Sequence, residues 1–185
     1  MLAFLHNQGV QERDQTHEAL AALSKQLELA NWAASRFRVG LPNRDEAIAE
    51  LSREAEETAV GNQRYVGIFV ADILSTLRLR HGNEASDHLL HEVSHKHIFP
   101  LFPGGKVFRW SAQSVLTVWH SQKTLAEISA SIAGSCEMPF DCRAFVGTRT
   151  ATFRITMRSA IFNVLTNTTE LIRNLDDFSK GAETK

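Results

Sequence analysis

One stretch decides the fold of this chain: KVFRWSAQSVLTVW, residues 106–119. Side chains alternate in character on both sides of Ser111-Ala112, and β-branched and aromatic residues dominate, as half-buried strands prefer. The stretch is therefore predicted to form two short strands that meet at a tight turn. Such a turn carries chemistry when glycines let the backbone approach a phosphate and a neighbouring acid holds a metal. Residues 111–114 contain neither glycine nor acid.

The composition limits the classes of protein to which the chain can belong. It has 185 residues, of which 43% are hydrophobic, enough for one domain with an extension. The formal net charge of −1 gives no indication of a nucleic-acid-binding surface or of an anionic membrane partner. No apolar run reaches the roughly 18 residues of a membrane span, so the chain is expected to be soluble and cytoplasmic. Cys136 and Cys142 are expected to be reduced structural thiols.

The N-terminal part is predicted to be a separate helical extension. Residues 11–38 contain no proline or glycine, and their apolar residues follow a 3-4 spacing: Leu20, Leu23, Leu27, Ala30, Ala34 and Phe37. The pattern fits an amphipathic helix that packs on its own domain, and equally a coiled-coil-like helix that forms a dimer or relays a signal. The predicted boundaries are an extension over residues 1–38, a domain over 39–180 and a tail over 181–185.

The remaining elements predict an α+β fold. Asn43 and Glu46 form a capping-box pair before a helix that runs to about Thr58. Residues 65–73 are nearly all apolar, which indicates a central strand buried on both faces. Further helices are expected over 84–98 and 122–135, strands over 140–146 and 151–157, and a last helix from Thr166 or Asn167. This order predicts a mostly antiparallel sheet with helices packed on it.

Three segments, in this order and at these distances, resemble the GGDEF domain, the diguanylate cyclase domain of bacteria. Residues 40–44, Gly-Leu-Pro-Asn-Arg, match the family's opening turn, with Val39 in place of its threonine. Residues 82–90 keep the glycine, aspartate and two leucines of the family's GHxxGDxLL segment. Residues 109–115 align with the signature, an arginine and an aromatic residue followed by GGDEF. The resemblance covers roughly residues 36–180 and implies a nucleotide-cyclase, ferredoxin-like core with a long preceding helix.

The resemblance also implies that the catalytic groups are missing. The family condenses two GTP molecules with two metal ions, which are held by an aspartate ending the first strand and by an acid of the signature turn. The strand position falls at Val70, so no carboxylate is there to bind metal. A shift of the register by one or two residues would make Asp72 a ligand but would leave the turn without an acid. The vestigial signature turn consists of Ser111, Ala112, Gln113, Ser114 and Val115, and the resemblance puts the two acids of the signature at Gln113 and Ser114.

Three residues remain as candidates for residual nucleotide binding. Asp72 matches the family's second aspartate, and Asp87 matches an aspartate that reads guanine. Arg78 stands where the family has the partner asparagine, and an arginine at this place can meet a phosphate. They leave open a nucleotide sensor that binds GTP or a related nucleotide without turnover.

The function implied by the resemblance is a catalytically inactive GGDEF-like domain. It is expected to act as a regulatory or protein-interaction module in cyclic-di-GMP signalling, with no metal and no cofactor. The partner is expected to be a protein of the signalling system, and the N-terminal helix is expected to form a homodimer.

A competing motif lies at residues 91–95, where His-Glu-Val-Ser-His spells the HExxH signature of zinc hydrolases. The apolar side of the predicted helix carries Leu89, Leu90 and Val93, so the two histidines are expected on the opposite, solvated side. A catalytic zinc needs a walled cleft and a third protein ligand. A zinc hydrolase is therefore the remote alternative, weak adventitious metal binding is a second alternative, and surface histidines are the simpler interpretation.

Two further charged groups are interpreted as solvated surface. Arg143, Arg149, Arg154 and Arg158 could face an anion, but they fit a row on a solvent-facing strand better, and Asp176-Asp177 fit the exposed face of the last helix.

Overall fold

The computed structural model of the chain describes residues 40–53, 63–136, 138–164 and 167–181. All of these except Gly40 belong to one compact unit, Leu41–Lys185. The helix predicted over residues 11–38, and the dimer seam expected on it, lie outside the described residues. None of the described helices is long and apolar enough to cross a membrane.

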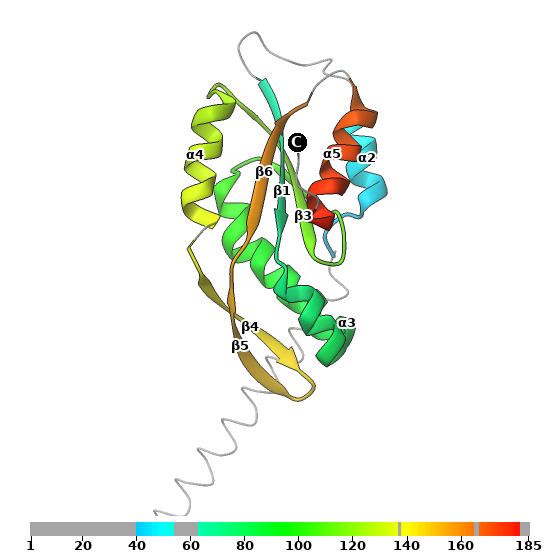
Figure 1. The fold of residues 1–185 in the computed structure, drawn as a ribbon, viewed down its shortest axis with the longest axis vertical. Coiled ribbons are helices and arrows are strands. Elements are labelled where there is room, and N and C mark those ends of the chain that lie inside the picture. The colour runs from blue at the N-terminus through cyan, green and yellow to red at the C-terminus, as the bar shows by residue number, and fades with distance from the viewer. Residues whose placement is uncertain (1–39, 54–62, 137, 165–166, 182–185) are drawn as a thin grey trace, which may run out of the picture. The chain divides into compact units, whose positions relative to one another are not determined.

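A four-stranded antiparallel sheet forms the centre of the described residues (Figure 1). Its strands are β1 (Gln63–Val70), β2 (Lys106–Arg109), β3 (Ser114–Ser121) and β6 (Arg158–Asn163). They lie in the order β2-β3-β1-β6, and every neighbouring pair is antiparallel. With the helices between them they follow the β-α-β-β-α-β order of ferredoxin-like folds. The predicted α+β class and the hairpin over 106–119 are therefore confirmed.

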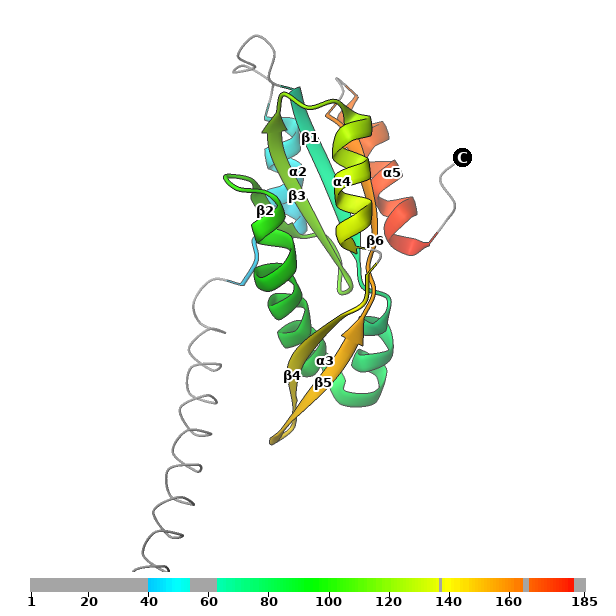
Figure 2. The same ribbon diagram turned by 90° about the vertical axis from the view of Figure 1, so that its left-hand side faces the viewer.

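Helices cover both faces of the sheet (Figures 1 and 2). α3 (Ile73–Val93) and α4 (Leu125–Cys136) lie on one face, and α2 (Arg44–Ser52) and α5 (Thr168–Lys180) lie on the other. Alternation along β1 supplies both cores: Tyr65 and Phe69 pack with α3 and α4, while Val66, Ile68 and Val70 pack with α2 and α5. This explains why the run is apolar throughout, because a central strand between two helical layers has no solvated face.

The structure corrects four of the sequence predictions. β6 was not expected, although it forms an edge of the central sheet. The strands expected over 140–146 and 151–157 are present as β4 (Phe140–Val146) and β5 (Arg149–Ile155), but they form a separate hairpin that turns at Gly147 and are not part of the central sheet. α2 ends at Ser52 rather than near Thr58, because the backbone of Arg53 is extended. The helix expected over 84–98 is part of α3, which is kinked at Gly82 with φ of 85° and continues into a π-helix, η1 (Ser94–Ile98), and a 3-10 turn, η2 (Phe99–Leu101).

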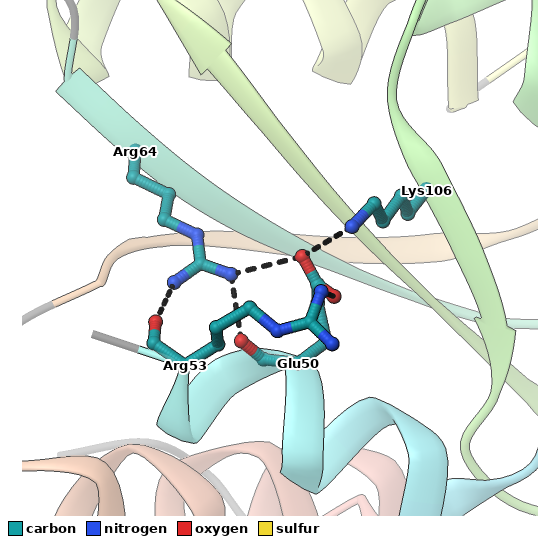
Figure 3. Close-up of polar contacts among 4 residues, drawn as sticks. All are labelled: Glu50, Arg53, Arg64 and Lys106. Carbon is teal, nitrogen blue, oxygen red and sulfur yellow. Dashed lines mark hydrogen bonds and ion pairs between the residues drawn. The ribbon is translucent and has the colours of Figure 1, made fainter. Parts of the chain in front are cut away.

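A cluster of charges attaches the C-terminal end of α2 to the sheet (Figure 3). Arg64 donates to the backbone carbonyl of Arg53 at 2.8 Å and to that of Glu50 at 2.7 Å, and the Glu50 carbonyl also accepts the Arg53 N–H at 3.2 Å. The Glu50 carboxylate accepts from Lys106 at 2.8 Å and lies 3.3 Å from Arg64. Burial raises the pKa of Glu50, but the Lys106 hydrogen bond and the charges of Lys106, Arg53 and Arg64 hold it below its usual value. The cluster fixes α2 against β1 and β2.

Candidate functional site

The vestigial signature turn is a closed hairpin turn. The backbone N–H groups of Trp110 and Ser111 both donate to the Ser114 carbonyl, at 3.0 and 3.2 Å. The Ser111 and Ser114 hydroxyls are 2.6 Å apart, and the Ser111 hydroxyl also accepts from the Gln113 N–H at 3.2 Å. The Ser111 and Ser114 side chains therefore fill the inside of the turn and hydrogen-bond within it. The backbone forms this tight turn although it contains no glycine.

The turn lies against the end of β1. The family's metal-binding positions, which the resemblance aligns with Val70 and Ser114, meet there. Val70 and Ser114 are direct partners in the register of β1 and β3, and both are fully buried. The Gln113 carbonyl accepts from the Ala71 N–H at 3.0 Å. The two positions at which a carboxylate is expected from the family therefore come together here as an isopropyl group and a hydroxyl. Neither is a suitable ligand set for a hard divalent cation, which prefers several carboxylate oxygens.

The turn also packs on the C-terminal end of α5. The Ser114 hydroxyl lies 3.0 Å from the hydroxyl of Ser179, and the Gln113 side-chain amide donates to the Ser179 carbonyl at 3.3 Å. Ser179 is 6% exposed. Gln113 and Ser114, the two side chains at the positions of the signature's acids, thus hydrogen-bond to this helix end.

Asp72 lies just after β1 and forms a two-pronged ion pair with Arg158. Arg158 Nε is 2.8 Å from Oδ2 of Asp72, and Nη2 is 2.9 Å from Oδ1. Arg158 is the register partner of Val70 and also lies over the Phe178 ring, 5.3 Å from its centroid. The hydrogen bond from Arg158 holds the pKa of Asp72 below its usual value. The interpretation of Arg158 as part of a solvent-facing row is therefore corrected. Arg158 lies on β6, and its guanidinium neutralises the Asp72 carboxylate.

Replacing Arg158 with alanine is expected to raise the pKa of Asp72 toward its ordinary value of 3.8, because the charged hydrogen-bond donor is lost. A carboxyl-detected NMR titration of wild type and Arg158→Ala measures this directly. The pKa of Asp72 is depressed in the folded chain, so the ion pair's contribution to stability is present above pH 3.8 and is lost as the pH falls through the folded value. An unchanged Asp72 titration in the variant would contradict the assignment of Arg158 as its partner.

The three segments that carry the resemblance meet at Arg109. Its backbone N–H donates to the Pro42 carbonyl at 2.7 Å, and its side chain pairs with Asp87, with Nη2 at 2.5 Å from Oδ1. Its Nε donates to the Ser111 carbonyl at 3.3 Å. Asp87 is therefore already paired with an arginine, as Asp72 is. Arg78 is exposed on the first half of α3, and within the described part of the chain it forms no ion pair with either aspartate.

A pocket of about 450 Å³ opens on the α5 side of the turn. Residues 110–113 line it together with Arg44, Asp176 and Lys180. Asp176 accepts from Arg44 at 2.7 Å and from the Trp110 indole N–H at 3.1 Å, so it was wrongly interpreted as a solvated residue. The three candidates for residual nucleotide binding, Asp72, Arg78 and Asp87, are not among its lining residues.

The HExxH segment has its two histidine rings together but lacks the rest of a zinc hydrolase site. The ring centroids of His91 and His95 are 4.2 Å apart. Glu92, the expected base, forms an ion pair with Lys96. Within the described ranges no group of three His, Cys, Asp or Glu side chains is arranged to hold a metal ion. Burial lowers the pKa of His91, which is half-buried rather than fully solvated as expected.

Sequence reasoning missed Arg109, Arg158 and Ser179 as parts of this site. The partners Arg158 and Asp72 are 86 positions apart, and Ser179 and Ser114 are 65 apart, so no local spacing announces either contact. The sequence offered only a weak signal for the strand that carries Arg158, because residues 158–163, Arg-Ser-Ala-Ile-Phe-Asn, show neither clean alternation nor a continuous apolar run.

Comparison with known proteins agrees with this architecture. No protein-family model and no curated protein matches the sequence. Among solved structures, the isolated GGDEF domain of YfiN (TpbB) from Pseudomonas aeruginosa is similar over 77% of this chain and 84% of its own, with a TM-score of 0.59 and 20% identity. The diguanylate cyclase SiaD of the same organism, in complex with its activator SiaC, has a TM-score of 0.58 over 97% of this chain and 75% of its own, with 16% identity.

A third similar structure is the GGDEF domain of DgcB from Caulobacter crescentus in complex with c-di-GMP. It covers 77% of this chain and 85% of its own, with a TM-score of 0.54 and 14% identity. Identities this low establish the fold alone. The chain therefore contains a domain with the GGDEF fold.

Proposed function

We propose that this chain is a catalytically inactive GGDEF-like domain that acts as a regulatory or protein-interaction module in cyclic-di-GMP signalling. The observation that supports the proposal is the pairing of Val70 with Ser114 at the end of β1, without a carboxylate on either strand. Condensation of two triphosphates needs metal ions to offset their charge and to activate the attacking hydroxyl. Neither side chain can hold such an ion.

The two retained aspartates support the same proposal. Asp72 is bound by Arg158 and Asp87 by Arg109, so a metal or a base edge would have to displace a guanidinium to reach either carboxylate. Both ion pairs are partly exposed and individually weak, so they oppose ligand binding only modestly. The absence of acids at Val70 and Ser114 is the larger obstacle.

Similar proteins support a protein partner. SiaD is a diguanylate cyclase whose structure holds its activator SiaC, so at least one domain of this fold works in an assembly with a second protein. In this chain we propose that residues 1–38 form the dimerising or signal-relaying helix and that the described domain offers the partner surface.

A second candidate function is a nucleotide sensor, because DgcB holds c-di-GMP and because Asp87 and the arginines around the turn are groups that can meet a base and phosphates. Titration of the full chain with GTP and Mg²⁺ in a calorimeter separates the two functions. The interaction module is expected to give no saturable heat at high micromolar GTP. Saturable heat, with an affinity for GTP that falls at least tenfold in Asp87→Asn, would instead establish the nucleotide sensor and would contradict a module that binds no nucleotide.

A further inference from the structure

Two histidine rings pack against each other, with their planes tilted, at the junction of α3 and the π-helix η1. His91 lies in the last turn of α3, and His95 is the second residue of η1. Their ring centroids are 4.2 Å apart with 50° between the ring planes. His95 is exposed and His91 is half-buried, so the pair opens to solvent on one side.

The neighbouring side chains set the orientation of this pair. His95 also stacks on Phe99, with ring centroids 4.8 Å apart and 27° between the planes, so its ring lies between His91 and Phe99. Glu92 pairs with Lys96 instead of with either imidazole. The two rings are therefore arranged before any ligand arrives, which lowers the ordering cost of binding.

We propose that His91 and His95 together bind one divalent transition-metal ion of the Ni²⁺ or Zn²⁺ class, each through one ring nitrogen. Imidazole suits these ions, whereas Mg²⁺ and Ca²⁺ prefer oxygen. Nitrogens bound to the same Zn²⁺ lie about 2.0–2.1 Å from it and so at most about 4 Å from each other. Rings with centroids 4.2 Å apart can present nitrogens at that separation.

The site is a binding site and carries no hydrolytic chemistry. Within the described residues no third His, Cys, Asp or Glu completes it, so the remaining coordination positions of a bound ion would be open to water. Glu92 is engaged with Lys96 and is not available as a base. A bound ion would connect α3 with η1, a π-helical turn of the kind that often occurs at functional positions, and would stabilise that junction by mass action.

Calorimetric titration of the full, untagged, chelator-treated chain with NiCl₂ and with ZnCl₂ tests the proposal. Wild type is expected to show one binding event that weakens at least tenfold in His95→Ala and in His95→Gln. The matched control is His81→Ala, because His81 is also exposed and lies on α3 outside the pair. Histidines in residues 1–39 are common to all these variants, so they do not affect the difference.

A second measurement guards against a folding defect. Circular dichroism and the unfolding midpoint without metal should be the same for wild type, His81→Ala and His95→Ala, because both replaced side chains are exposed. Addition of NiCl₂ should raise the unfolding midpoint of wild type and of His81→Ala but not of His95→Ala. Equal Ni²⁺ affinity and an equal rise in midpoint for His95→Ala and wild type would overturn the proposal.

Discussion

Replacing Leu89 with alanine is expected to lower the free energy of unfolding by roughly 3 kcal/mol. Leu89 lies on α3 with no exposed surface, in the core that joins α3 and α4 to one face of the sheet. The variant loses the transfer free energy of the removed methyl groups and leaves a cavity that the close-packed core fills only partly. Chemical denaturation should show a lower midpoint with an unchanged slope.

The matched control for this prediction is Leu79→Ala on the same helix. Leu79 is 88% exposed, so its truncation is expected to change the free energy of unfolding by no more than about 0.5 kcal/mol. The two variants make the same chemical change in the same element and differ in burial alone. Equal effects of the two would mean that the face of α3 turned toward the sheet is not the one described.

Replacing Arg64 with alanine is expected to lower the free energy of unfolding by about 3 kcal/mol. The Arg64 side chain is only 8% exposed and donates to two carbonyls at the end of α2 as well as to the Glu50 carboxylate. Its removal takes a charged donor away from both carbonyls and from the partly buried Glu50 carboxylate, and it loosens the attachment of α2 to β1. Urea unfolding of the variant measures the loss.

Lys106→Ala is the control in the same cluster. Lys106 is 56% exposed and makes one contact with Glu50, so the expected loss is below about 1 kcal/mol and should shrink further in high salt. The loss in Arg64→Ala should be less sensitive to salt, because the Arg64 side chain is only 8% exposed and two of its hydrogen bonds go to uncharged backbone carbonyls. Similar losses for the two variants would show that the cluster acts through surface charge instead of through the helix end.

The fold was predictable from the sequence where the local pattern of apolar and polar residues matches the burial of those residues in the structure. The alternation over residues 106–119 gave the hairpin, the Asn43–Glu46 pair gave the start of α2, and the apolar run after Gln63 gave the central strand. β6 was missed because its six residues are all half-buried, which gives neither clean alternation nor a continuous apolar run. Edge strands with mixed burial depend on a partner strand that is distant in the sequence.

The sequence predicted where the site lies in the fold but not which side chains contact one another there. Alignment of residues 109–115 with the signature located the turn, and the register then joined Val70 to Ser114. The partners of Asp72 and Asp87 were not predicted, because an arginine on a strand gives no indication of which carboxylate it will meet. Such pairs are fixed by tertiary packing.

Incubation of the purified full chain with GTP and either Mg²⁺ or Mn²⁺ tests catalytic inactivity most directly. With an active diguanylate cyclase as the positive control in the same buffer, this chain is expected to produce no cyclic di-GMP above the protein-free blank. Formation of cyclic di-GMP at a rate comparable to the control, and its loss in Asp72→Asn, would show that Asp72 holds a metal after all and would contradict the proposal that the catalytic site has been lost.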